Sequence, residues 1–268
     1  MIGAIIGDIA GSRFEFDNYR RKDFKLLDED SFFTDDTVMT LAVAKALLES
    51  GKDYSSLGGN CVKYMRQIGS NYPLCGYGGR FFSFIFGPDP KSYNSWGNGA
   101  AMRVSAVPYV ASSLEEVKLL SRIVTEVSHN HPEGIKGAEA AAVCGYMAMQ
   151  GKTKDEIRAY VRDNYYPLDF TIDSIRDTYL FNETCQGTVP QAIEAFLESS
   201  SFEDAIRTAV SVGGDSDTLA AITGGIAEPF YGVSMVMRAR VKSCYLDKRL
   251  LQILEEFEGK YPARTILC

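Results

Sequence analysis

The chain has 268 residues, of which 46% are hydrophobic and 24% are charged, and its formal net charge is −7. These values are typical of a globular protein that buries a large core without disulfide or metal staples. The negative charge argues against broad electrostatic binding to nucleic acid or to an anionic membrane, and no run approaches the ~20 apolar residues of a spanning helix.

The six cysteines form no C-x-x-C pair, and several lie in apolar or helical stretches where buried free thiols are common. This use of cysteine favours a reducing compartment, so we expect a cytoplasmic protein. The apolar N-terminal stretch is short, lacks a basic region and carries Asp8 early. We therefore do not expect it to be a signal peptide.

Apolar residues recur at helical spacing along the chain, whereas alternating strand patterns are nearly absent. The first expected helix, residues 2–13, carries Gly3, Gly7 and Gly11 at four-residue spacing, which predicts close packing against another helix or a ligand. Further helices are expected at 36–49, 57–68, 98–111, 114–127, 134–149, 154–164, 172–181, 189–199, 203–212, 217–231 and 247–258. The sequence therefore predicts an all-α fold of about a dozen helices.

Two clusters of acids and threonines each open an apolar helix, one at residues 34–37 (TDDT) and one at 215–218 (DSDT). A single carboxylate is enough to cap a helix start, and further carboxylates repel one another unless a cation lies between them. Oxygen ligands without His or Cys suit Mg²⁺, Mn²⁺ or Ca²⁺ rather than Zn²⁺. Each cluster alone is compatible with an ordinary cap. As a pair, they predict that the two helix starts meet and hold one or two divalent ions.

Two segments of small residues have backbone N–H groups that an anion could reach. The glycine-rich run at residues 75–80 (CGYGGR) is either an ordinary turn or a nest for phosphate. The segment from Asn98 to Arg103 opens an expected helix with small residues, which leaves its N–H groups accessible. Asn98 is equally well explained as a simple cap, and Arg103 lies one turn later, within reach of an acid or a phosphate.

His129 and His131 are the only histidines, and they lie in a loop before an expected helix. Their spacing resembles a metal pair, but no third histidine or neighbouring cysteine completes a zinc site. A hydrogen bond to substrate or a purely structural role is therefore favoured. Serine-nucleophile, Walker A and dinucleotide patterns are missing, which leaves carboxylates and metal as the chemical equipment.

Five motifs, taken in order, resemble those of the ADP-ribosylglycohydrolases, the family that includes the dinitrogenase-reductase-activating glycohydrolase and the ADP-ribosylarginine hydrolases. They are Gly7-Asp8 through Glu15, Thr34 to Thr37, Gly97 through Arg103, Ser128-His129, and Gly214 to Thr218. The resemblance runs over essentially the full length. It implies one domain over residues 1–268, an all-α orthogonal bundle with a cleft that holds two Mg²⁺ ions, with Mn²⁺ as the alternative.

The resemblance also implies roles for individual residues. The implied metal ligands are Thr34, Asp35, Asp36, Asp215, Asp217 and Thr218. Glu15 matches an acid near the metals that assists catalysis or gates the site in some members. Our hypothesis for the mechanism is that Asp36 or Glu15 takes a proton from the attacking water. The implied substrate-binding residues are Gly76, Tyr77, Gly78, Gly79, Asn98, Gly99, Met102, Arg103 and His129. For Tyr77, stacking on a ring of the substrate and membership of the core are both open.

The implied activity is magnesium-dependent cleavage of the glycosidic bond between ADP-ribose and a protein side chain or a small acceptor. Arginine-specific members of the nitrogen-fixation type carry an acid in the loop that corresponds to Gly76–Gly79, and this chain has none there. The loop looks more like that of members that cleave O-linked ADP-ribose, so the linkage stays open. The alternatives are a non-catalytic ADP-ribose or nucleotide binder, as in relatives that serve as lens crystallins, and a metal-dependent phosphohydrolase.

Overall fold

Helices account for nearly all the regular structure in a computed structural model that describes residues 1–263 and 265–266. Within these residues the all-α prediction is confirmed, with fourteen α-helices and one short pair of parallel strands. The helices are α1 (Ile2–Gly11), α2 (Asp35–Glu49), α3 (Leu57–Gly69), α4 (Gly79–Phe86), α5 (Val107–Val110), α6 (Leu114–Glu126), α7 (Pro132–Met149), α8 (Lys154–Asn164), α9 (Ile172–Ile175), α10 (Cys185–Glu198), α11 (Phe202–Val210), α12 (Ser216–Tyr231), α13 (Met235–Cys244) and α14 (Lys248–Lys260). The 3-10 helices are η1 (Ser12–Phe14) and η2 (Asn98–Ala100), and the strands are β1 (Val233–Ser234) and β2 (Thr265–Ile266).

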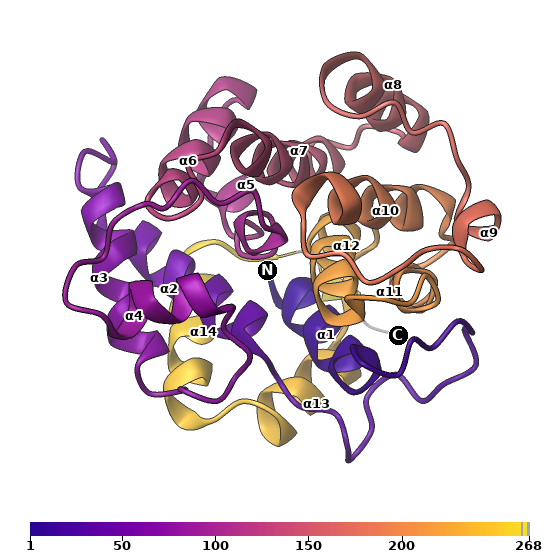
Figure 1. The fold of residues 1–268 in the computed structure, drawn as a ribbon, viewed down its shortest axis with the longest axis horizontal. Coiled ribbons are helices and arrows are strands. Elements are labelled where there is room, and N and C mark those ends of the chain that lie inside the picture. The colour runs from indigo at the N-terminus through magenta and orange to yellow at the C-terminus, as the bar shows by residue number, and fades with distance from the viewer. Residues whose placement is uncertain (264, 267–268) are drawn as a thin grey trace.

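Helices α1 and α12 lie side by side in the middle of the molecule, and the other helices surround them (Figure 1). The glycines of α1 make this approach possible. A Cβ on Gly7 would lie 2.0 Å from the carbonyl oxygen of Ala220, and one on Gly3 would lie 2.4 Å from that of Gly224. Gly11 meets the first turn of α12 in the same way. The glycine spacing therefore marks backbone-to-backbone packing of two helices.

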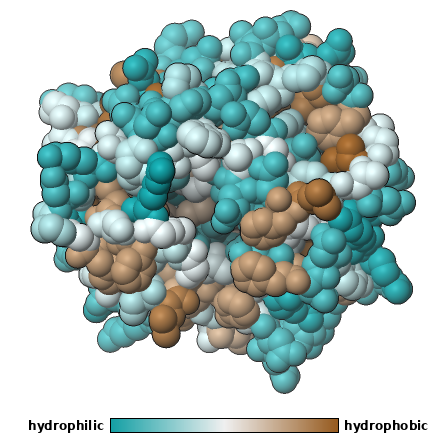
Figure 2. All heavy atoms as spheres, in the orientation of Figure 1, coloured by the Kyte–Doolittle hydropathy of each residue, from teal (hydrophilic) through white to brown (hydrophobic). Residues whose placement is uncertain are grey.

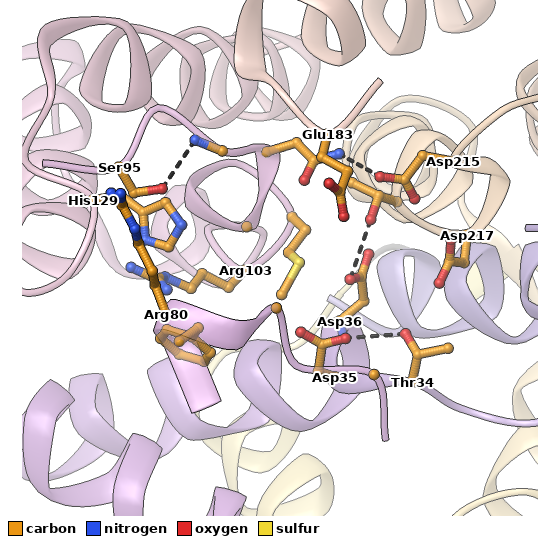
Figure 3. Close-up of a pocket in the computed structure, with 18 of the residues that line it drawn as sticks. Thr34, Asp35, Asp36, Arg80, Ser95, Arg103, His129, Glu183, Asp215 and Asp217 are labelled. Atoms are coloured by element: carbon orange, nitrogen blue, oxygen red, sulfur yellow. Dashed lines mark hydrogen bonds between the residues drawn. The ribbon is translucent and has the colours of Figure 1, made fainter. Parts of the chain in front are cut away.

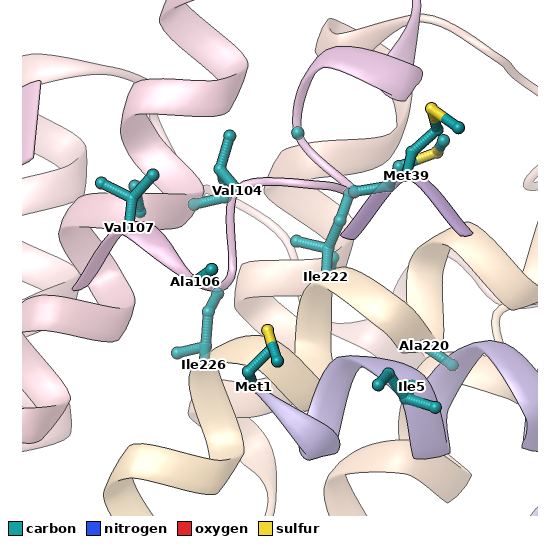
Figure 4. Packing of buried hydrophobic residues seen from close by; sticks show 14 of the residues in the cluster. Met1, Ile5, Met39, Val104, Ala106, Val107, Ala220, Ile222 and Ile226 are labelled. Atoms are coloured by element: carbon teal, nitrogen blue, oxygen red, sulfur yellow. The ribbon is translucent and has the colours of Figure 1, made fainter. Parts of the chain in front are cut away.

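The apolar core extends outward from this central pair (Figure 4). Ile5 of α1 and Ile226 of α12 are buried together with Met39 of α2 and Val107 of α5. Burial of this apolar surface is the main force that holds the helices together. Because α12 and α2 both pack on α1, their N-terminal ends are brought to the same region, although about 180 residues separate them along the chain.

The structure differs from the sequence expectations in several elements. Residues 98–111 do not form one helix: η2 is followed by a turn and by the short α5. Pro108 lies in the first turn of α5, where a helix start tolerates a residue without an N–H, so a new helix begins there instead of one helix continuing from residue 98. Helix α9 ends at Ile175, well before residue 181, and the sequence reasoning missed α4 and α13.

The described thiols are all free, with Cys61, Cys144 and Cys185 buried. Cys268 lies outside the described residues. In the described part of the chain, no helix combines the length and the apolarity needed to cross a membrane. The face shown in Figure 2 is mostly hydrophilic, with separate apolar clusters.

Candidate active site

A cavity of about 270 Å³ opens where the starts of α2, α4, α12 and η2 converge. It contains fifteen of the sixteen residues that the sequence singled out, and Tyr77 is the exception. The fifteen are Glu15, Thr34, Asp35, Asp36, Gly76, Gly78, Gly79, Asn98, Gly99, Met102, Arg103, His129, Asp215, Asp217 and Thr218. In Figure 3 the aspartates lie on one side of this cavity, and Arg103, Ser95 and His129 lie on the other.

Asp8 fixes the start of α2 against α1. Its carboxylate accepts hydrogen bonds from the Thr34 hydroxyl at 2.7 Å and from the backbone N–H groups of Thr34 and Thr37, and the Thr37 hydroxyl also donates to it. Asp8 is fully buried, so these four donor groups replace the water that its charge would otherwise bind. This clamp holds Asp35 and Asp36, which follow Thr34 directly, at the wall of the cavity.

Two carboxylate oxygens at this acidic end are buried without a hydrogen-bond donor. Asp36 Oδ2 and Asp217 Oδ1 are buried and have no partner among the described residues. The second oxygen of Asp36 receives only a long bond from the Thr218 hydroxyl, at 3.4 Å. One carboxylate oxygen from each of Glu15, Asp215 and Asp217 lies within 4.8 Å of the other two. These side chains come from opposite ends of the chain and point into one space.

Burial and mutual repulsion make the charged forms of these acids unfavourable. Burial, together with the negative charges of Asp8 and Asp215, raises the pKa of the Asp35 carboxyl to about 8. Burial and the charges of neighbouring acids likewise raise the pKa of Asp36 and of Asp217 well above the usual range. The causes of these shifts include no lysine or arginine. A positive charge among the carboxylates would therefore relieve both the desolvation and the repulsion.

The residues at the acidic end fit a divalent cation. The donors are carboxylate and hydroxyl oxygens, which are the ligands that Mg²⁺, Mn²⁺ and Ca²⁺ prefer. The unsatisfied oxygens of Asp36 and Asp217 are the observation that favours an ion, because a buried acceptor without a donor is costly in a folded protein. The starts of α2 and α12 therefore lie together at this cavity, as the two acid clusters predicted.

Asn98 does not act as a helix cap; it links the acidic end to the segment before α10. Its side-chain amide donates to Asp215 Oδ2 at 2.6 Å and to the Thr188 hydroxyl at 3.2 Å. Its backbone N–H donates to the carbonyl oxygen of Glu183 at 2.8 Å. Gly97, not Asn98, is the N-cap of η2. Asn98 therefore orients one of the candidate metal ligands.

Backbone groups form the wall next to the acids. Gly78 is the N-cap of α4 and Gly79 its first residue, and a Cβ on either would meet no atom within 4 Å. The first N–H groups of a helix have no partner within it, so the start of α4 offers donors beside open space. Gly76 has a φ of +110°, and a Cβ there would lie 3.0 Å from Asp35 Oδ1. Glycine at position 76 thus lets the loop run close to the acidic end.

A buried chain of hydrogen bonds orients His129. Arg103, which is fully buried, donates from Nη2 to Ser128 Oγ at 2.7 Å and to the carbonyls of Val124 and Thr125. Ser128 Oγ lies 2.8 Å from His129 Nδ1. Because Oγ accepts from Arg103, its own hydrogen is available for Nδ1, which places the ring hydrogen on Nε2.

The state of the His129 ring follows from its surroundings. Burial, and then the charge of Arg103, hold the pKa of His129 well below its usual range, so the ring is neutral. A Cβ on Gly99 would lie 3.3 Å from His129 Nε2. The neutral ring therefore presents an N–H donor beside Gly99 at the wall of the cavity.

Tyr77 belongs to the packing beside the cavity. Its hydroxyl donates to the carbonyl oxygen of Gly69 at 3.2 Å, and its ring packs against Phe81 at a centroid distance of 5.8 Å. The core alternative for Tyr77 therefore fits the structure. The sequence reasoning did not single out six further lining residues, which are Arg80, Phe81, Tyr93, Ser95, Gly97 and Glu183. Gly97 and Arg80 carried a signal, since Gly97 belongs to the Gly-Asn-Gly motif and Arg80 ends the glycine-rich run at residues 75–80.

Comparisons with known proteins agree with one another. The model of the ADP-ribosylglycohydrolase family matches residues 1–265. ADP-ribosylhydrolase ARH3 of Homo sapiens is 25% identical over 275 residues, which cover 80% of this chain and 74% of that protein. ADP-ribosylarginine hydrolase Tri1 of Pseudomonas putida is 25% identical over 295 residues, which cover 98% of this chain and 77% of that protein.

A solved structure described as an ADP-ribosylglycohydrolase-related protein complex has a similar fold. Its TM-score is 0.64 at 23% sequence identity, and the match covers 96% of this chain and 92% of that one. The same arrangement of helices is therefore kept at low sequence identity.

Proposed function

Because this chain belongs to the ADP-ribosylglycohydrolase family, we propose that it is a metal-dependent hydrolase that cleaves the glycosidic bond between ADP-ribose and an acceptor. The acceptor is a protein side chain or a small molecule. The observation that carries the proposal is the pair of buried, unsatisfied carboxylate oxygens of Asp36 and Asp217 in the cavity that the glycine-rich start of α4 also lines. One end of the cavity suits cations and the adjoining wall suits a pyrophosphate.

Two Mg²⁺ ions, with Mn²⁺ as the alternative, are the proposed cofactors. The residues that would hold them are Thr34, Asp35, Asp36, Asp215, Asp217 and Thr218. The chemistry that such ions supply when bound is Lewis acidity toward substrate oxygens and a lowered pKa of coordinated water.

Glu15 is the proposed general base. Cleavage builds oxocarbenium character at C1 of the distal ribose, and the attacking water must lose a proton. The carboxylate of Glu15 lines the cavity and accepts no hydrogen bond from a described residue, so it is free to take that proton. Asp36 is the second candidate, although it is buried and already accepts from Thr218. A general base contributes about 10²–10⁴-fold to the rate.

The substrate is held by neutral donors. N–H groups near Gly78 and Gly99 bind the pyrophosphate, and Met102 supplies apolar contact at the same wall. His129 donates from Nε2 to a substrate oxygen. Arg103 touches Ser128 rather than a free acid, so we assign it a positioning role through His129.

Product analysis tests this function. The purified protein is incubated with arginine-linked and serine-linked ADP-ribose, with Mg²⁺ added or with EDTA present. Release of free ADP-ribose from at least one conjugate, and only with metal, is expected. AMP as the product would point to a phosphohydrolase, and tight binding without any product to a non-catalytic binder. Full turnover in EDTA would contradict the metal requirement.

A further inference from the structure

Two chain segments meet at the mouth of the cavity, beside Glu15. Residues 15–20 follow η1, and residues 179–183 precede α10. Arg20 donates to the carbonyl oxygen of Tyr179, and Asn18 Oδ1 accepts from the N–H of Gly214 at 3.0 Å. Gly214 has a φ of +68°, and a Cβ there would lie 3.2 Å from the Cα of Phe181. The two segments are therefore held together and against the start of α12.

The carboxylate of Glu183 stands at this mouth without a partner. Glu183 lines the cavity together with Glu15, and neither side chain has a hydrogen bond or an ion pair with another described residue. The main chain at this position is fixed, because the Glu183 carbonyl accepts from Asn98 and the next residue, Thr184, caps α10. The structure thus places a second acid at the solvent side of the candidate metal site, on a main chain that hydrogen bonds hold in place.

Two exposed phenyl rings accompany the two acids. Phe16 follows Glu15 directly and is 85% exposed, and Phe181 precedes Glu183 by two residues and is 44% exposed. The two rings stack at a centroid distance of 6.1 Å with an interplanar angle of 19°. A ring as exposed as that of Phe16 contributes little to the core, and each ring belongs to a residue within two positions of an unpaired acid along the chain.

We propose that Glu183 and the Phe16–Phe181 pair form an acceptor subsite that binds the guanidinium group of arginine-linked ADP-ribose. A guanidinium is planar, pairs with a carboxylate through two parallel hydrogen bonds and stacks on aromatic faces. A serine acceptor offers neither a cation nor a flat surface. The loop at Gly76–Gly79 has no acid, so Glu183 supplies the missing negative charge from the opposite segment. This inference rests on the proposed function.

The reaction at this subsite balances with water alone. The bond between ribose C1 and the guanidino nitrogen breaks, and the water oxygen bonds to C1. One hydrogen of the water goes to the departing nitrogen, so the acceptor leaves as the arginine guanidinium. Glu183 binds this cation before and after cleavage, which makes it a specificity-determining residue.

The test compares kcat/KM for arginine-linked and serine-linked ADP-ribose in wild type, Glu183→Gln, Glu183→Asp and Asp177→Asn. Asp177 is an exposed acid of the same segment that does not line the cavity, so it controls for net charge. In Glu183→Gln the ratio of arginine to serine activity falls about tenfold, as expected for loss of a charge-assisted pair at an exposed site. Glu183→Asp restores part of the ratio, and Asp177→Asn leaves it unchanged.

Each remaining outcome is decisive. The subsite is contradicted if wild type cleaves only the serine conjugate, or if Glu183→Gln lowers both activities equally. If wild type cleaves neither conjugate, the proposed function fails, and the intact conjugates are then titrated by calorimetry. The subsite is supported if wild type binds the arginine conjugate more tightly than the serine conjugate and Glu183→Gln reduces this difference. Equal binding of both conjugates to wild type would overturn it.

Discussion

The two sides of the cavity differ in the charge of the buried groups that they leave without a hydrogen-bond partner. On the His129 side, Arg103 and Ser128 satisfy one ring nitrogen and leave the other as a donor. On the acidic side, Asp36 and Asp217 are buried with unsatisfied oxygens, and their charged forms are disfavoured. Arg103 Nε and Nη1 are nevertheless buried without a hydrogen-bond partner, so each side keeps unsatisfied groups, which are donors on the His129 side and acceptors on the acidic side. The cations proposed above would satisfy the acidic side and leave the donors of Arg103 unchanged.

The largest expected effect is loss of turnover when an acid of the acidic side is removed. Asp217→Ala and Asp36→Ala each lower kcat by at least about 10³-fold, because the ligand set for the metals is broken. The fold is retained, since both changes also remove a buried, unsatisfied carboxylate. The control is Asp163→Ala, which removes an exposed acid that does not line the cavity. Activity within tenfold of wild type in both cavity variants would contradict the account.

The second prediction concerns the helix pair that brings the acidic side together. Gly7→Ala places a Cβ 2.0 Å from the Ala220 carbonyl oxygen, so α1 and α12 must separate. We expect the free energy of unfolding to fall by about 3 kcal/mol or more, with loss of activity. Gly59→Ala, in helix α3, meets no atom within 4 Å and is expected to be neutral or stabilising. Denaturant unfolding of both variants measures the difference, and equal stability would show that α1 and α12 are not in close contact.

The third prediction uses the pKa of Asp35, which is raised from 3.8 to about 8 in the folded protein. A carboxyl with a raised pKa binds its proton more tightly when folded, so its contribution to stability is present below pH 4 and is lost as the pH rises toward 8. The metal-free protein should therefore lose thermal stability between pH 4 and pH 8, by roughly 5–10 °C. Asp35→Asn should flatten this slope, and added Mg²⁺ should reduce it. A wild-type Tm that rises steadily over this range would contradict the prediction.

The smallest effect is expected on the His129 side. Ser128→Ala removes the group that orients His129 Nδ1, and kcat/KM should fall about threefold to tenfold, which corresponds to one ordinary hydrogen bond. The nitrogen chemical shifts of the ring report its tautomer directly. Wild type should show the hydrogen on Nε2, and Ser128→Ala a mixture. A hydrogen on Nδ1 in wild type would overturn the assigned orientation.

The sequence was informative where a pattern repeats or where like charges gather. The spacing of Gly3, Gly7 and Gly11 predicted the close helix packing, and the two acid clusters predicted that their helix starts meet. Periodicity could not locate the break after η2, because the burial of Arg103 against carbonyls of α6 is a tertiary contact. Glu183 was also missed, since a lone acid before a cap carries no local signal and only the pairing with Asn98 brings it to the cavity.

The central claim is that the acidic side binds divalent cations, and Mn²⁺ titration followed by electron paramagnetic resonance tests it most directly. The account predicts two bound ions per wild-type chain, displaced by excess Mg²⁺. It also predicts the loss of at least one ion in Asp217→Ala and full retention in Asp163→Ala. A wild-type protein that binds no Mn²⁺, or an Asp217→Ala variant that binds it as wild type does, would contradict the account.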